Sequence, residues 1–238
     1  MIALIPARGG SRGLIGKNIK NFNGIPLVGL AVLDCINAEN IEEVYISTDD
    51  KKIEEIAISF GAKSLGLRPS HLASDGSLVN DTFRYMIDII SSDKNKSIEE
   101  LMIAQPTSPL RIPEDIDNSI NMYFNNQADS VISFTHQPNP ISWFKAIDSN
   151  NRILSTSGHS SFSNRQDEPM LFVPNGAVYV LSKNVIFSNS WYSKKTYAYI
   201  MPKERSIDID DNYDFEFATH MSRKLGIKNS SNNTLNDI

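Results

Sequence analysis

A chain of 238 residues, 40% of them hydrophobic, is long enough to bury a substantial core, and we expect one principal domain. Its 23 Lys and Arg residues against 28 Asp and Glu give a net charge of −5, which argues against a basic surface for nucleic acid. The first residues lack the features of a signal peptide, and no later apolar run approaches the length of a membrane span. We therefore expect a cytoplasmic protein that binds neither nucleic acid nor a membrane.

The first part of the chain alternates short apolar runs with amphipathic segments. Strands are predicted over residues 2–5, 44–48, 101–104 and 130–134, and helices over residues 26–38, 51–60, 80–90 and 114–124. This alternation is typical of parallel strands joined by crossover helices. We therefore predict an α/β fold with an open, doubly wound, mostly parallel sheet, whose ligands bind beyond the carboxyl ends of the strands.

The alternation stops between about residues 135 and 174, where Pro, Ser and Asn surround aromatic islands such as Trp143-Phe144. This segment is too long for an ordinary connection, so we expect an excursion from the domain with its own function. Beyond it, strands are predicted over residues 177–181 and 197–201, and a last helix over residues 211–225. Residues 1–228 then form the single domain, and residues 229–238 form a polar tail that is expected to fray.

A glycine-rich loop follows the first predicted strand. It interleaves three cations with four glycines, namely Arg8, Arg12 and Lys17 with Gly9, Gly10, Gly13 and Gly16. Glycine lets backbone N–H groups approach an anion closely, and the cations offset its charge, which suits a triphosphate. The spacing matches neither the Walker A loop nor the dinucleotide fingerprint. The alternative is a solvated surface loop.

Two aspartates lie just before the last predicted helix, in the segment Ser206-Ile-Asp-Ile-Asp210. Along a strand, Asp208 and Asp210 would point to the same face, and carboxylates so close repel unless a cation lies between them. Hard oxygen ligands favour Mg²⁺ shared with substrate phosphates. Alternatively, Asp210 or Asp211 caps the last helix, and the segment alone does not decide between these interpretations.

Other polar residues occupy the ends of predicted strands or the links after them. Asp49 could belong to a site, but a cap of the helix that begins near residue 50 is the interpretation we favour. Arg68 and Asp75 lie in a turn-rich link and could be structural. The segment Gln105-Pro-Thr-Ser-Pro-Leu-Arg111 would carry Gln105 and Arg111 into the crevice, although Arg111 could instead face solvent.

Seven motifs, in this order, resemble those of the CMP-sialic acid synthetases (acylneuraminate cytidylyltransferases), including bacterial relatives of the CMP-legionaminate type. They fall between Ile2 and Leu225 and are Ile5-Pro-Ala-Arg-Gly-Gly-Ser-Arg-Gly13, Gly16-Lys-Asn18, Ser47-Thr-Asp49, Arg68-Pro69 with Leu72-Ala-Ser-Asp75, Gln105-Pro-Thr-Ser-Pro-Leu-Arg111, Pro174-Asn-Gly-Ala-Val-Tyr179 and Ser206-Ile-Asp-Ile-Asp210. Any one motif would be weak, whereas the ordered series is specific.

The resemblance implies a nucleotide-diphospho-sugar transferase-like fold and a cytidylyltransferase that uses CTP and Mg²⁺, for which Mn²⁺ may substitute. It implies an acidic nine-carbon sugar as acceptor, either N-acylneuraminate or a related nonulosonate such as legionaminate. The implied nucleotide-binding residues are Ala7, Arg8, Gly9, Ser11, Arg12, Lys17, Asn18, Arg68 and Asp75. Asp208 and Asp210 match the magnesium-binding aspartates, and they join Arg8, Arg12, Lys17 and Gln105 as catalytic candidates.

The sugar site and the excursion also follow from the resemblance. The implied sugar-binding residues are Gln105, Arg111, Lys145, Arg165, Asn175 and Tyr179, with Arg165 as the partner of the sugar carboxylate. Tyr179 could instead be a core aromatic. The excursion resembles a dimerisation segment and implies a homodimer. Two departures are Arg12, where the family usually has Lys, and Val173, where many relatives have Arg; the second leaves the identity of the sugar open.

Two alternatives remain at this point. One is another sugar nucleotidyltransferase, for example one that activates 3-deoxy-manno-octulosonate. The other is a catalytically silent nucleotide-binding module on the same fold, because a fold alone does not establish activity.

Overall fold

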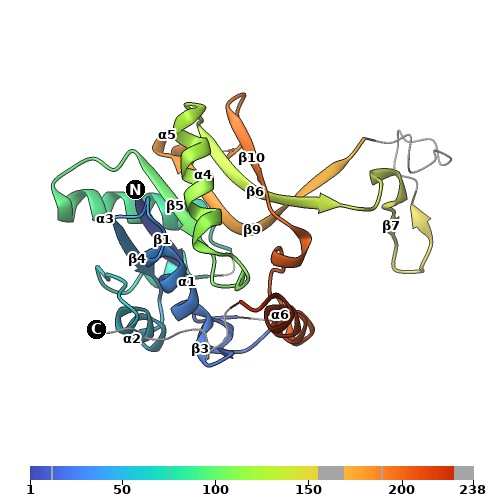
Figure 1. Cartoon of the computed structure of the whole chain (residues 1–238), viewed down its shortest axis with the longest axis horizontal. Coiled ribbons are helices and arrows are strands. Elements are labelled where there is room, and N and C mark those ends of the chain that lie inside the picture. Colours follow the sequence, from blue (N-terminus) through green and yellow to red (C-terminus); the bar gives the residue numbers. More distant parts are fainter. Residues whose placement is uncertain (12, 75, 155–168, 189, 228–238) are drawn as a thin grey trace.

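The computed structural model describes residues 1–11, 13–74, 76–154, 169–188 and 190–227, and its centre is a six-stranded sheet (Figure 1). The strands are β1 (Ile2–Pro6), β4 (Glu43–Ser47), β5 (Glu100–Ala104), β6 (Ser130–Gln137), β9 (Leu171–Ser182) and β10 (Thr196–Ile200). They lie in the order β10-β6-β9-β5-β1-β4, and β9 alone runs antiparallel to its neighbours. The predicted mostly parallel α/β sheet is confirmed.

Helices cover both faces of this sheet. They are α1 (Leu27–Ile36), α2 (Lys51–Ser59), α3 (Val79–Lys94), α4 (Pro113–Asn125), α5 (Lys183–Phe187) and α6 (Asn212–Leu225). One apolar cluster joins α1, α2 and α4 to one face, and a second joins α3 and α5 to the other. Because both faces are buried, the strands read as nearly continuous apolar runs. In the described part of the chain, no helix combines the length and apolar character that a membrane crossing requires.

A third apolar cluster lies outside the sheet, between α1, α6 and a small hairpin. The hairpin pairs β2 (Asn21–Phe22) with β3 (Ile25–Pro26). Its Phe22 packs with Leu27 and Leu30 of α1 and with Ala218 of α6. The same cluster buries Ile209 completely, so the aspartate segment is anchored by its central apolar residue.

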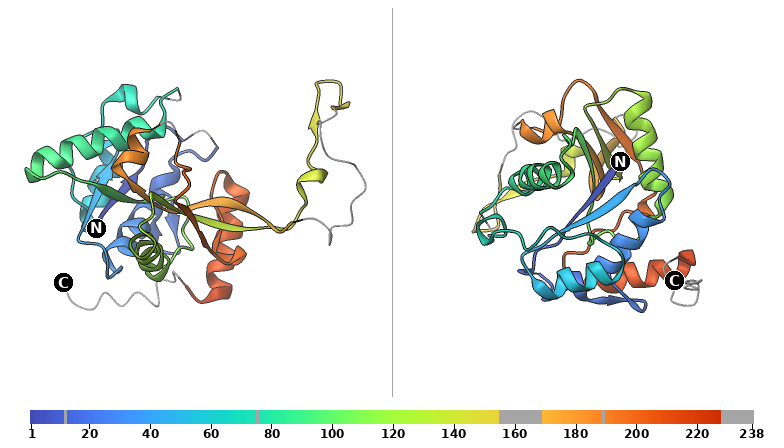
Figure 2. Two further views of the ribbon diagram at one scale, coloured as in Figure 1. Left: turned by 90° about the horizontal axis from the view of Figure 1, so that it is seen from above. Right: turned by 90° about the vertical axis from the view of Figure 1, so that its left-hand side faces the viewer.

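A long arm projects from the body of the molecule (Figure 2). It begins where β6 and β9 continue as an antiparallel pair, with Thr135 opposite Val173 and Gln137 opposite Leu171. At its far end, β7 (Ala146–Ile147) pairs with β8 (Ile153–Leu154). The arm lies within the predicted excursion. The predicted ends of both long strands were wrong, because these strand extensions pair with each other outside the core and need no continuous apolar pattern.

Candidate functional site

A cavity of about 500 Å³ opens at the carboxyl end of the sheet. Its walls come from the loop after β1, the link before α3 with the first turn of that helix, the turn after β5, and the segment before α6. The lining residues are Pro6, Arg8, Ser11, Gly13, Lys17, Asn18, Arg68, Leu72, Ser77, Val79, Thr82, Gln105, Pro106, Thr107 and Asp210. This is the position and the size expected of a ligand site in a doubly wound sheet.

The glycine-rich loop is fastened to the aspartate segment. Lys17 donates to the carbonyl oxygen of Ile209 at 2.6 Å and to Asp210 Oδ1 at 3.2 Å, and its side chain is only 14% exposed. The Gly13 backbone lies directly against the Asp210 carbonyl group, where a Cβ atom would overlap that oxygen. Asn18 Nδ2 donates to the Arg8 carbonyl oxygen at 2.9 Å and fixes the course of the loop. The cations Arg8 and Lys17 and the carboxylate of Asp210 therefore line one cavity.

The aspartate segment, residues 206–210, forms neither a helix nor a strand, so strand alternation does not determine where its two aspartates point. Ile209 is buried, and its N–H donates to the Thr107 carbonyl oxygen at 2.8 Å, so the two aspartates flank a fixed anchor. Asp211 caps α6 by accepting from the Asp214 N–H at 3.0 Å. The capping interpretation therefore holds for Asp211, whereas the Asp210 carboxylate pairs with Lys17.

Asp208 is exposed, yet its environment is unfavourable for a charged carboxylate. The surrounding protein atoms raise its pKa, and the negative charge of Asp210 adds to this shift. A hydrogen bond with the Thr107 side chain and the charge of Lys17 act in the opposite direction. A cation bound between Asp208 and Asp210 would relieve this repulsion.

Two arginines from different segments line the cavity: Arg8 of the glycine-rich loop and Arg68 of the link before α3. The Arg68 side chain is buried and donates from Nη1 to Thr82 Oγ1 at 3.1 Å, while Nη2 lies 3.6 Å from Asp49 Oδ1. Burial lowers the pKa of Arg68; the charge of Asp49 opposes this shift, and the charge of Arg8 adds to it. An anion bound near both guanidinium groups would reduce the repulsion between them.

The structure brings together most of the predicted nucleotide-binding residues. Arg8, Ser11, Lys17, Asn18, Arg68, Gln105 and Asp210 line the cavity. Ala7 and Gly9 are held by the end of β4 instead, because their N–H groups donate to Ser47 O and Asp49 Oδ1. Arg12, Asp75 and Arg165 lie outside the described residues.

The interpretation of Asp49 as a helix cap was wrong. Asp50 caps α2, since its Oδ1 accepts from the N–H groups of Lys52 and Ile53 at 2.8 and 3.2 Å. Asp49 contacts the glycine-rich loop and Arg68 instead.

Two of the predicted sugar-binding residues are structural. Arg111 is 1% exposed; its Nη1 donates to the carbonyl oxygens of Gln105 and Ala177, and its Nη2 lies 3.3 Å from Asp34 Oδ2. Asn175 is also buried, and it accepts from Ser133 Oγ at 2.6 Å and donates to Ser206 Oγ at 2.9 Å. Both side chains are thus buried among protein partners, and neither lines the cavity, so sugar binding by these two residues stays a prediction.

The other sugar-binding candidates have different surroundings. Gln105 lies beside Asp208, because both side chains approach the position that a Cβ atom of Gly176 would take. Tyr179 packs edge-on against Trp191, with ring centroids 5.3 Å apart; burial and the charge of Asp208 raise its pKa to about 12. Lys145 is exposed next to β7 at the far end of the arm, remote from the cavity of its own chain (Figure 1).

Sequence reasoning missed several residues of the cavity wall. Thr82, Ser77 and Val79 come from the start of α3 and the turn before it. No local pattern marks them, because their place in the wall depends on how α3 packs against the sheet. Thr107 lies inside a motif that we singled out, and its position between Gln105 and Arg111 was a usable signal.

The fold and the cavity together define an α/β protein with a cationic, glycine-lined anion site beside a pair of carboxylates. The family model described as cytidylyltransferase matches residues 2–225, and the chain belongs to this family. The chain is 30% identical to a CMP-N,N'-diacetyllegionaminic acid synthase of Legionella pneumophila, over 90% of this chain and 93% of that protein.

Two further comparisons extend this result. The chain is 31% identical to an N-acylneuraminate cytidylyltransferase of Escherichia coli over 94% of its length, and it spans about half of that relative, 52%. The solved structure of a CMP:2-keto-3-deoxy-manno-octonic acid synthetase complexed with CTP superposes with a TM-score of 0.69. That match covers 94% of this chain and 98% of the other. At 14% identity this last similarity shows the fold alone.

Proposed function

We propose that this chain transfers CMP from CTP to an acidic nine-carbon sugar, N-acylneuraminate or a related nonulosonate such as legionaminate, and releases pyrophosphate. The observation that carries the proposal is the cavity itself, in which Arg8, Lys17 and Arg68 face Asp210 and Gln105. The names of the relatives from Legionella pneumophila and Escherichia coli support an acidic nine-carbon sugar as the acceptor. A site of this composition accommodates a polyanion and a polar sugar together.

The proposed reaction is an in-line attack of the anomeric hydroxyl of the sugar on the α-phosphorus of CTP. A new bond forms between the sugar oxygen and the α-phosphorus, while the bond between the α-phosphorus and pyrophosphate breaks. Such a transfer asks little covalent chemistry of the protein, so positioning and charge neutralisation supply most of the acceleration. Arg8 and Lys17 would stabilise the charge that develops on pyrophosphate, and Gln105 would orient the sugar.

We propose Mg²⁺, with Mn²⁺ as a substitute, as the cofactor held by Asp208 and Asp210. Among the described residues there is no group of three or more His, Cys, Asp or Glu side chains that could hold a metal ion. Mg²⁺ is nevertheless commonly held by one or two carboxylates, with substrate phosphates and water as its other ligands. The raised pKa of Asp208 beside Asp210 supports such a site. When bound, the ion would polarise the α-phosphate.

We also propose a cytoplasmic homodimer in which the arm contacts a second copy of the chain. Large apolar side chains are exposed on the arm, among them Ile141, Trp143, Phe144, Ile147, Ile153 and Leu154. Apolar surface gathered in this way commonly marks a protein interface. The cytoplasm is the compartment that we expect for an enzyme that consumes CTP.

The function is tested by offering the purified protein CTP, Mg²⁺ and a panel of acidic sugars, with mass spectrometry of the nucleotide products. We expect a CMP conjugate and pyrophosphate with at least one nine-carbon sugar. If a conjugate formed only with 3-deoxy-manno-octulosonate, that sugar would be the acceptor and the proposed nine-carbon acceptor would be wrong. Absence of pyrophosphate release with every sugar, despite CTP binding, would indicate the silent nucleotide-binding module.

A further inference from the structure

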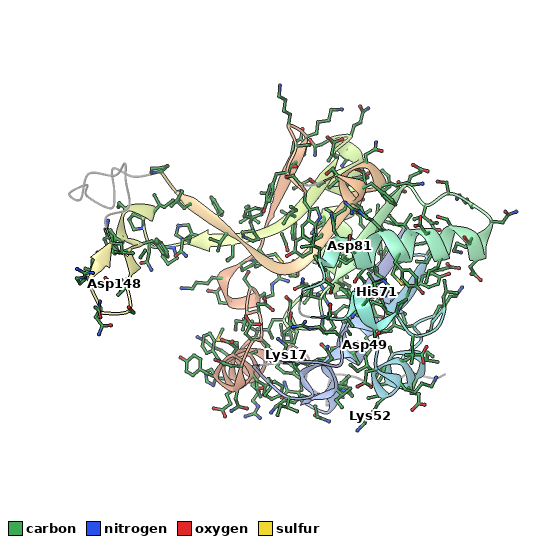
Figure 3. All side chains as sticks on the ribbon, turned by 180° about the vertical axis from the view of Figure 1, so that it is seen from behind. Lys17, Asp49, Lys52, His71, Asp81 and Asp148 are labelled. Carbon is green, nitrogen blue, oxygen red and sulfur yellow. The ribbon has the colours of Figure 1, made fainter. Side chains whose placement is uncertain are left out.

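Asp49 is a carboxylate placed close to a cavity that receives a polyanion. It lies two residues after the end of β4, and its side chain is 29% exposed. A negative charge at this position repels phosphate unless nearby groups neutralise it. Since Asp50 is the residue that caps α2, helix capping does not explain Asp49. Figure 3 shows Asp49 in the body of the molecule together with Lys17, whereas Asp148 lies at the far end of the arm.

The contacts of Asp49 join two walls of the cavity. Its Oδ1 accepts from the Gly9 N–H at 3.0 Å, and Gly9 belongs to the glycine-rich loop. The same oxygen lies 3.6 Å from Nη2 of Arg68, which comes from the link before α3. One carboxylate oxygen therefore sets the spacing between the phosphate loop and a buried cation.

Arg68 depends on this carboxylate. Its main chain is already fixed, because the Arg68 N–H donates to the Thr48 carbonyl oxygen at 2.7 Å. The direction of the guanidinium group is set by Thr82, a neutral partner, and by Asp49, a charged one. Within the described structure, Nε of Arg68 has no hydrogen-bond partner. Without Asp49, the partners of this buried cation among the described residues would be the Thr82 hydroxyl group and the like charge of Arg8.

We propose that Asp49 is a positioning residue for the nucleotide: it holds the Arg68 guanidinium group directly, and the glycine-rich loop through the Gly9 amide, in the arrangement that receives a nucleoside triphosphate. This inference rests on the proposed function and assigns part of its nucleotide site. It also predicts whether CTP binding becomes tighter or weaker when the charge of Asp49 is removed. A carboxylate that merely stood near the phosphates would weaken CTP binding, so its neutralisation would tighten binding. A positioning carboxylate has the opposite effect, because its neutralisation releases Arg68.

Asp49→Asn separates the two contacts of this side chain. The amide oxygen still accepts the Gly9 N–H, but the charge that pairs with Arg68 is lost. We expect both the KM and the dissociation constant for CTP to rise about tenfold, on the scale of one lost, partly buried ion pair. The KM for the sugar should stay within about twofold. Asp49→Ala removes both contacts and should weaken CTP binding further.

The matched control is Asp50→Asn, which makes the same change in charge at the next residue. Because Asn caps helices as well as Asp does, α2 should be unaffected and the CTP constants should stay within about twofold. A CTP dissociation constant for Asp49→Asn that is unchanged or lower than that of the wild type would overturn the proposal.

A double-mutant cycle shows whether Asp49 acts through Arg68. In an Arg68→Met background, the Asp49→Asn change should alter CTP binding by less than about twofold, because the group it positions is absent. A full tenfold effect in that background would also overturn the proposal. Equilibrium dialysis with labelled CTP measures binding without turnover. A wild-type protein that binds CTP but transfers no CMP would therefore refute the proposed function and leave the test of Asp49 intact.

Discussion

Arg111 illustrates how a residue in a functional motif can serve the fold. Its guanidinium group is buried against Asp34, a residue of α1 that is itself buried, and it also binds two backbone carbonyl groups. It thereby joins the turn after β5 to α1 and to β9. Removing one partner of a buried ion pair leaves an uncompensated charge, which costs about 3–5 kcal/mol.

We therefore expect Arg111→Ala to lower the free energy of unfolding by about 3–5 kcal/mol, measured by urea denaturation. Arg152→Ala is the matched control, because Arg152 forms an exposed pair with Asp148 on the arm. Loss of an exposed pair costs about 0–1 kcal/mol. An Arg111→Ala protein of wild-type stability with a raised KM for the sugar would restore the sugar-binding role.

The raised pKa of Asp208 predicts how the stability of the protein depends on pH, with a sign that is unusual for an aspartate. Its pKa is raised in the folded state, so the folded protein binds this proton more tightly than the unfolded chain does. The contribution of Asp208 to stability therefore grows as the pH falls through the folded pKa, and it is lost as the pH rises. In the absence of divalent ions, Asp208→Asn should be more stable than the wild type at neutral pH. The gain should be at most about 1 kcal/mol, because the residue contacts solvent.

Thermal unfolding with and without Mg²⁺ measures this effect. A change of 1 kcal/mol moves the midpoint by about 2–4 °C in a chain of this size. The advantage of Asp208→Asn should vanish near about pH 3, where carboxyl groups are protonated. Added Mg²⁺ with CTP should raise the midpoint of the wild type more than that of the variant. A wild type that is more stable than the variant in EDTA at neutral pH would contradict the assignment.

At the scale of elements, the site depends on close contact between the glycine-rich loop and the segment that carries the aspartates. Gly13 allows this contact, because any larger residue would place its Cβ atom on the Asp210 carbonyl oxygen. Gly13→Ala should push the two segments apart and lower kcat/KM for CTP by about 100-fold, the scale of a displacement of about 1 Å in a reacting site.

Gly76→Ala provides the comparison for this prediction. Gly76 precedes α3, and none of the described atoms lies within 4 Å of the position that its Cβ would take. Steady-state kinetics should show a change of less than about twofold for this variant. Equal activities of the Gly13→Ala and Gly76→Ala proteins would mean that the close contact is not required.

The sequence predicted the elements whose two faces are buried, because apolar runs report burial directly. The strands β1, β4 and β5 agree with their predicted ranges to within one residue at each end. The extensions of β6 and β9 could not be predicted, since they pair in the arm without a core. The antiparallel direction of β9 follows from its return along that arm, which no local pattern of residues records.

Some residues of the site could be predicted from the sequence, whereas the roles of others could not. The glycine-rich loop and Gln105 could be recognised from local composition, and they do line the cavity. The roles of Asp49 and Arg111 depend on partners that lie far away in the sequence, namely Gly9 and Asp34. Their assignment therefore required the tertiary structure. Asp208 and Asp210 were identified correctly as neighbours, although the strand invoked for them does not form.

At the scale of the whole molecule, the exposed apolar residues of the arm lead to a prediction about the proposed dimer. Ile147 and Ile153 face each other across β7 and β8, and their exposed fractions are 62% and 69%. Replacing both with Asp should weaken the proposed dimer at least about 100-fold, because charged residues are depleted from the buried centre of an interface. Analytical ultracentrifugation should then find the mass of a single chain.

Asn150→Asp is the control for the arm, since it adds a charge in the turn between β7 and β8 without removing apolar surface. It should leave the dimer intact. The affinity for CTP should persist in the Ile147→Asp/Ile153→Asp protein, because the lining of the cavity comes from the body of one chain. A wild-type protein that sediments as a monomer at every concentration would contradict the proposed role of the arm.

The central claim is that one cavity holds the nucleotide between the glycine-rich loop and the two aspartates. A crystal structure of the protein with CTP and Mg²⁺ tests this claim most directly. We expect the triphosphate against Arg8 and Lys17, the cytidine toward Arg68, and the ion at Asp208 and Asp210. Electron density for CTP at any other place, with this cavity filled by water alone, would contradict the account.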